Sequence, residues 1–181
     1  MTRSARGLFV LLVALCAAPG CRPERPRQGT SGEASMAYLG VARALHHEAD
    51  VYESSGNYTH AAQAMERVLT LPMPADFAAR DDLRADAWGR LAELDLRRDD
   101  ADRALARCDE GLRATTRESV LLARLYMVRG QALRALADRA AAAHDDSGAA
   151  RMRDEAIAAL ERSIAINQRV LGRIITPGGR R

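Results

Sequence analysis

The chain has 181 residues, a length that suits one small domain or a short array of repeats. Aromatic residues make up only 4%, and all 27 basic residues are arginine. With abundant alanine and leucine, this composition favours helices and argues against β-sandwiches and barrels. The net charge of +3 arises at the ends, because residues 34–172 hold 19 arginines against 22 acids. A slightly acidic body argues against a nucleic acid as partner.

The first twenty residues are typical of a signal peptide. Two arginines precede an apolar run of twelve residues at 7–18, which is shorter than the roughly 20 residues that a membrane-spanning helix needs. Gly20 and Cys21 follow and resemble the end of the lipobox of bacterial lipoproteins, whereas Ala18 and Pro19 depart from that motif. The resemblance implies that Cys21 carries a lipid and becomes the mature N-terminus. The alternative is an ordinary cleaved signal followed by a chance cysteine.

A lipidated Cys21 would anchor the chain to a membrane of the cell envelope. In the usual sorting pattern of such lipoproteins, Arg22 after the cysteine implies the periplasmic face of the outer membrane. Residues 21–32 would then be the lipidated cysteine and a flexible tether rich in Pro, Gly and Arg. Only Cys108 would remain within the body, so packing rather than disulfides is expected to stabilise it.

Residues 33–172 are expected to form one helical domain, with 173–181 as a C-terminal tail. Apolar residues recur three and four positions apart throughout, Thr30 and Glu33 resemble a capping box, and Gly172 is expected to end the last helix. Three segments can be overlaid, each with a small residue in both of its expected helices. The small residues are Ala49 and Ala61, then Ala92 and Ala104, then Gly130 and Ala156, and the large ones include Tyr52, Met65, Trp88, Tyr126 and Leu160.

This pattern resembles the tetratricopeptide repeat over about residues 36–171. The resemblance implies an all-α fold, a right-handed superhelical array of about three helix hairpins. In each hairpin the small residues let the paired helices approach closely, and the large residues fill the gap to the next hairpin. The distance between the two small positions is twelve residues in both of the first two segments, which generic helical patterning would not require.

Departures from the family period of about 34 residues locate insertions. Nine extra residues fall near 72–75, four near 115–116, and fourteen around 145–148. The last insertion predicts an elongated third hairpin, held weakly by alanines, whose second helix is capped by Ser147. Asp95 stands where the family prefers a large apolar residue, and Arg107 is expected on the solvent side of its helix. No polar capping helix follows the third hairpin, so the array should have an uncapped C-terminal end.

No motif for catalysis, a cofactor or a metal emerges, so the chain is not expected to be an enzyme. The four histidines lack further ligands at a suitable spacing, and Cys108 is interpreted as a buried small hydrophobe. In the resembling fold the first helices of the hairpins line a concave groove. The groove residues would be Arg43, His46, Asp50, Glu53, Asp86, Glu93, Arg97, Arg124, Met127, Gln131 and Arg134.

Acids dominate this expected groove early and arginines late, which favours an extended or helical peptide of mixed charge. The alternative is that these side chains are merely solvated. The leading hypothesis is therefore a membrane-anchored envelope lipoprotein that acts as a scaffold for a protein or peptide partner. Two alternatives stay open: a structural subunit that forms homo-oligomers through its uncapped C-terminal end, and a secreted or periplasmic repeat protein without lipid. An envelope enzyme is the least supported hypothesis.

Overall fold

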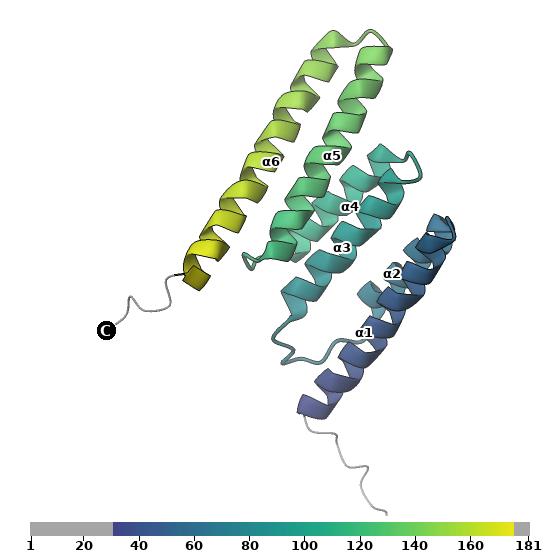
Figure 1. The fold of residues 1–181 in the computed structure, drawn as a ribbon, viewed down its shortest axis with the longest axis vertical. Helices are drawn as coiled ribbons and strands as arrows, with labels where there is room; N and C mark the ends of the chain where they lie inside the picture. Colours follow the sequence, from purple (N-terminus) through teal and green to yellow (C-terminus); the bar gives the residue numbers. More distant parts are fainter. Residues whose placement is uncertain (1–30, 176–181) are drawn as a thin grey trace, which may run out of the picture.

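The structure of the protein, a computed structural model, describes residues 31–175, and this range contains six helices and no strand. The helices are α1 Ser31–Ser54, α2 Tyr58–Thr70, α3 Arg80–Leu96, α4 Ala101–Ala114, α5 Val120–Ala142 and α6 Asp146–Ile175. They pair as three hairpins, α1–α2, α3–α4 and α5–α6, which stack side by side (Figure 1). The expectation of an all-α array with an elongated third hairpin is confirmed. Within 31–175, no helix combines the length and apolar character needed to cross a membrane.

Polar side chains fix where four of the helices begin. Asn57, Asp100 and Ser119 precede α2, α4 and α5, and each accepts a hydrogen bond from a backbone N–H three residues later. Asp145 does the same for α6, accepting from the N–H of Gly148 at 2.9 Å. The expectation that Ser147 caps α6 is wrong, because Ser147 lies inside the helix and its hydroxyl donates to Asp145. Thr30, expected to cap α1, lies outside the described residues.

The inserted segments lie where the spacing placed them, between or at the ends of helices. The nine-residue insertion is the connection 71–79 between α2 and α3, and its Phe77 is buried edge-on against Tyr38 of α1, with ring centroids 5.1 Å apart. The four-residue insertion is the connection 115–119 between α4 and α5. The third insertion lengthens both α5, of 23 residues, and α6, of 30 residues.

Gly172 does not end the last helix, contrary to the expectation from sequence, because α6 continues through it to Ile175. A glycine inside a helix costs only about 1 kcal/mol. Contacts on both sides of Gly172 offset such a cost: Val170 packs against the core, and Arg173 donates a hydrogen bond to the backbone carbonyl of Glu118, just before α5, at 3.4 Å.

Two apolar clusters hold the stack together, one at each junction between hairpins. The first joins α1 and α2 to α3 and includes the fully buried Met65 and Leu91. The second joins α3 and α4 to α5 and to Ile166 of α6. The small residues of the sequence pattern are buried as expected, with exposed fractions of 0% for Ala49, Ala61, Ala92 and Ala104 and 5% for Ala156. We call the contacts of α2 with α3 and of α4 with α5 the internal junctions.

Asp95 shows how one departure from the family pattern is accommodated. Asp95 lies in the last turn of α3, which ends at Leu96, and its side chain is only 1% exposed. Arg98, Arg103 and Arg107 approach its carboxylate at 3.4, 3.5 and 3.7 Å. Burial raises the pKa of Asp95 despite these three guanidinium groups. The expectation that Arg107 faces solvent is therefore wrong, because this half-buried residue pairs with Asp95 and Glu66 and lies over the ring of Trp88.

Candidate functional site

The charged residues expected to line a groove are brought together on α1, α3 and α5. His46 of α1 lies 3.7 Å from Asp86 of α3. From α5, Arg124 pairs with the same Asp86 at 3.0 Å and with Glu93 at 2.6 Å. The acids of α1 are paired as well, since Glu53 contacts Arg97 at 3.0 Å.

Arg90 lies at the centre of this network and was missed by the sequence analysis. Its guanidinium group donates to Asp50 and, at 2.7 Å, to Glu53. The periodicity of α3 was the available signal, because Arg90 shares a helix face with Glu93 and Arg97. Arg90 and Arg97 line a shallow hollow of about 370 Å³, together with Asp50, Glu53 and Ser54.

The pairing changes the expected electrostatics of this face. Acids of α1 face arginines of α3, and the arginine of α5 faces acids of α3, so charges of opposite sign neutralise each other across neighbouring helices. A partner would therefore not meet an acidic surface at the start of the array and a basic surface at its end. A mixed-charge peptide would have to displace these internal ion pairs. The free energy lost with the internal pairs would offset most of the free energy gained from the new ones.

The pKa of His46 indicates which protonation state its ring adopts among these charged residues. Its ring Nε2 is buried without a hydrogen bond, and burial lowers the pKa of the imidazole. Asp86 and Asp50 oppose this shift, while Arg90 and Arg124 add to it. The side chain is thus held mainly as a neutral ring that fills space between α1 and α3.

Four of the expected groove residues lie outside the paired network. Arg43 of α1 is exposed and has no ion pair with any residue in 31–175. Met127, Gln131 and Arg134 are exposed on α5, with Met127 36% exposed. Gln131 and Arg134 instead line a different pocket, formed between α5 and α6. Seven of the eleven expected residues therefore take part in ion pairs among α1, α3 and α5. Gln131 and Arg134 line the pocket between α5 and α6, and Arg43 and Met127 belong to neither group.

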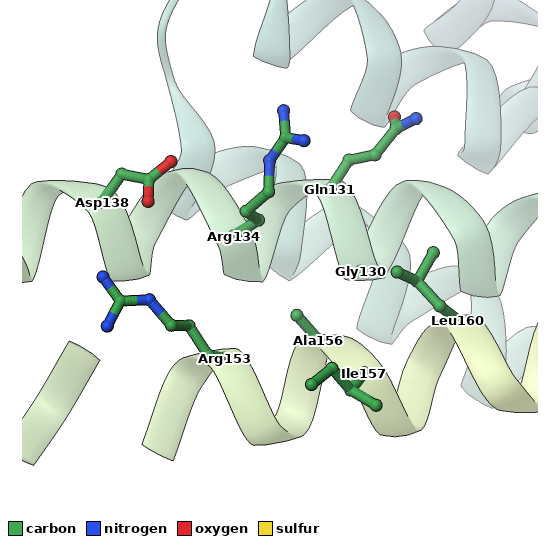
Figure 2. Close-up of a pocket in the computed structure, with 8 residues that line it drawn as sticks. All are labelled: Gly130, Gln131, Arg134, Asp138, Arg153, Ala156, Ile157 and Leu160. Carbon is green, nitrogen blue, oxygen red and sulfur yellow. The ribbon is translucent and has the colours of Figure 1, made fainter. Parts of the chain in front are cut away.

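The pocket between α5 and α6 has a volume of about 370 Å³ and a largely apolar floor (Figure 2). Gly130 of α5 makes room for Leu160 of α6, because a Cβ atom at Gly130 would lie 2.9 Å from the Leu160 Cγ atom. Arg134, Asp138 and Arg153 place charged groups toward one end of the pocket, away from Gly130 and Leu160 (Figure 2).

An exposed apolar row continues from this pocket along α6. Ile157, Leu160, Ile164 and Leu171 are 55%, 39%, 55% and 55% exposed. Their spacing of three, four and seven residues places them on one side of the helix. We call this row the end face, because α6 is the last described helix and none of the helices in 31–175 covers it. Leu171 was expected from sequence to belong to a partner or self-association surface at the uncapped end, whereas Ile157, Leu160 and Ile164 were not.

No cluster of three His, Cys, Asp or Glu residues within 31–175 is arranged to hold a metal ion. Cys108 is fully buried, as the interpretation of it as a small hydrophobe required. Burial raises the pKa of its thiol to about 12, so little of it ionises near neutral pH. Cys21, the expected lipidation site, lies outside the described residues.

Comparison with known proteins identifies the first hairpin. A family model described as tetratricopeptide repeat matches residues 42–72, which span the second half of α1 and all of α2. No curated protein and no solved structure matches the chain. The first hairpin thus carries a tetratricopeptide repeat, and an all-α array that contains such a repeat supports a role in binding other proteins.

Proposed function

We propose that the protein is a lipid-anchored scaffold of the cell envelope, which holds a protein partner through the end face of its helical array. The observation that carries this proposal is the row of exposed Ile157, Leu160 and Ile164 beside the pocket between α5 and α6. A contiguous apolar patch surrounded by charged side chains is a common mark of a protein-binding surface. Burying such side chains contributes about 25 cal/mol per Å² of apolar area removed from water.

The end face is better suited to a partner than the charged face of α1, α3 and α5. On the charged face, Arg90 and Arg124 already have carboxylate partners within the chain. On the end face, binding removes apolar surface from water without breaking an existing pair. The apolar row is therefore the surface on which a partner gains most.

The orientation of the array fits an anchor at Cys21. Ser31 begins α1 and Ile175 ends α6 at the same pole of the molecule (Figure 1). Ten residues of chain between Cys21 and Ser31 can span at most roughly 35 Å. A lipid on Cys21 would thus hold this pole near the membrane and leave the pocket between α5 and α6 accessible from the side.

Replacing the expected lipidated residue tests the anchor. The full chain with Cys21→Ser should move from the detergent-dependent membrane fraction to the soluble fraction, or accumulate with its leader uncleaved. Membrane association identical to that of the natural chain would overturn the lipid anchor. That result would not bear on the scaffold function, which the next experiment tests.

Matched charge insertions on α6 test the binding surface. Leu160→Asp places a carboxylate in the end face, whereas Ala158→Asp places one on an exposed side of the same helix that faces away from it. A protein that co-purifies with the full chain in detergent should be lost from the Leu160→Asp variant and retained by the Ala158→Asp variant. Equal recovery with both variants would exclude the end face as the binding surface.

A further inference from the structure

We infer that the partner of the end face is helix α1 of a second copy of this chain, stacked head to tail as the hairpins stack within one copy. This inference rests on the proposed function, because it names the occupant of the same surface. It follows from comparing equivalent positions of the three hairpins, aligned on their small residues Ala61, Ala104 and Ala156 for the second helices and Ala49, Ala92 and Gly130 for the first.

The second helices show that the end face has the residue pattern of an internal junction, although no further hairpin within residues 31–175 packs against it. Leu160 of α6 is equivalent to Met65 of α2 and Cys108 of α4. Met65 and Cys108 are both 0% exposed, because the following hairpin covers them, whereas Leu160 is 39% exposed. Ile164 shows the same contrast: it is 55% exposed, while the equivalent Leu69 and Leu112 are packed against the two core clusters.

The first helices show that α1 carries the matching surface, also without its neighbour. Ala44 is exposed, although the equivalent Ala87 of α3 and Leu125 of α5 are 0% exposed at the internal junctions. Val51 is 56% exposed, and its equivalents Leu94 and Ala132 are 1% and 0% exposed. We call this surface the start face. It comprises Gly40, Ala44, His47 and Val51, all of them exposed and none carrying an acid or an arginine.

The two faces are complementary in size, and neither contains an acid or an arginine. The end face presents large branched side chains, Leu160 and Ile164, while the start face presents Gly40 and Ala44 at its centre. Large residues fit against small ones at the internal junction of α4 and α5 too, where Trp88 and Leu125 fill the space left by Gly111. No buried charge would be left unpaired by bringing the two faces together.

A contact between two different faces of the same chain does not close on itself, so it generates rows of copies rather than pairs.

Disulfide cross-linking of the full chain in detergent tests this arrangement. A chain with both Ala44→Cys and Ile164→Cys should form a ladder of two, three and more linked copies on mild oxidation. The Ile164→Cys chain alone should stay at the background level of the natural chain, because Ile164 does not meet its own copy. A linked pair from Ile164→Cys alone would instead indicate two α6 helices face to face and would overturn the head-to-tail contact.

Adding a charge to the start face provides the control for the ladder. Val51→Asp in the double-cysteine chain should reduce the linked fraction about tenfold or more, because the carboxylate would be buried without a partner. Ser54→Asp, on an exposed side of α1 whose equivalents Arg97 and Ala135 are also exposed, should leave the ladder intact. Absence of a ladder from the double-cysteine chain would overturn the inference. In that case the proposed function would still stand if a different protein co-purified with the natural chain and was lost from the Leu160→Asp variant.

Discussion

The second helices of the first and third hairpins use the same positions in opposite surroundings. Met65 of α2 is fully buried beneath α3, whereas its equivalent Leu160 of α6 is 39% exposed beside a pocket. The side chains are similar in size and polarity, so the difference comes from the lack of a further hairpin packed on α6 within residues 31–175, and not from a change in the sequence pattern. The comparison teaches that α6 retains the surface of an internal junction at a place where an ordinary array would end in a polar helix.

A second contrast separates the end face from the charged face. Arg90 and Arg124 bind carboxylates of neighbouring helices, so the charged face is closed by contacts within the chain. The apolar side chains of α6 have no such partners among the described residues. The charged face is thus expected to hold the hairpins in alignment, and the end face to meet other molecules.

The largest effect is expected at the equivalent pair Met65 and Leu160. Met65→Ala should lower the free energy of unfolding by about 2–5 kcal/mol, because it leaves a cavity in a covered junction. Leu160→Ala should cost about 1 kcal/mol or less at low protein concentration, because its side chain is partly in water. Chemical denaturation of both variants measures the difference. Equal costs would mean that Leu160 is covered in solution even at low concentration, and the contrast between the two helices would fail.

A smaller effect is expected from adding a methyl group at the internal junction of α4 and α5. In Gly111→Ala the new Cβ atom would lie 2.7 Å from the Trp88 Cβ atom and 2.8 Å from the Leu125 Cδ2 atom. Overpacking of this kind should destabilise the chain by about 1–3 kcal/mol. Gly89→Ala is the matched control, because its nearest neighbour is 3.9 Å away and helix propensity alone should act. Thermal unfolding that ranked the two variants in reverse order would contradict the tight packing at Gly111.

A stabilising change is expected near the end of α6. Gly172 is helical and a Cβ atom there would meet nothing within 4 Å. Gly172→Ala should therefore raise the free energy of unfolding by about 0.5–1 kcal/mol through helix propensity. Hydrogen exchange of the last turn of α6 would detect the gain locally. A loss of stability would show that this turn is not helical in solution.

The smallest effect is expected from pH at His46. Its folded-state pKa lies below 6.5, so the folded state favours the neutral ring. The stability that this contributes is present above pH 6.5 and is lost as the pH falls through the lowered value. The advantage of the natural chain over His46→Gln in melting temperature should accordingly shrink between pH 7.5 and pH 5. A growing advantage at acidic pH would instead indicate that the imidazolium is stabilised by Asp86 and Asp50.

The sequence predicted those features that depend on spacing along one chain. Small residues twelve positions apart predicted the paired helices, and deviations from the repeat period predicted the connections 71–79 and 115–119 and the long third hairpin. These features follow from the helical period and from the close approach that Ala or Gly permits. The tetratricopeptide repeat match over residues 42–72 supports the same alignment.

The features that sequence missed depend on side chains that reach between helices. Arg90 binds Asp50 and Glu53, which precede it by about forty residues, and no local pattern shows which pairs form. Arg107 was expected to face solvent because arginine usually does, yet its equivalent in the first hairpin is the buried Ala64. The cap of α6 was misplaced by two residues, because Asp145 and Ser147 are both good capping residues and only geometry distinguishes them.

The burial of Cys108 has a practical consequence for following motion in this array. Its thiol lies in the cluster that joins α4 to α5, with a pKa raised to about 12. The thiol can therefore lose its proton and react with an alkylating reagent only when that junction opens. The rate at which such a reagent modifies Cys108 in the natural chain therefore measures how often the second and third hairpins separate. If copies join through α6, the rate of Cys108 modification should fall. This measurement needs no label added to the protein.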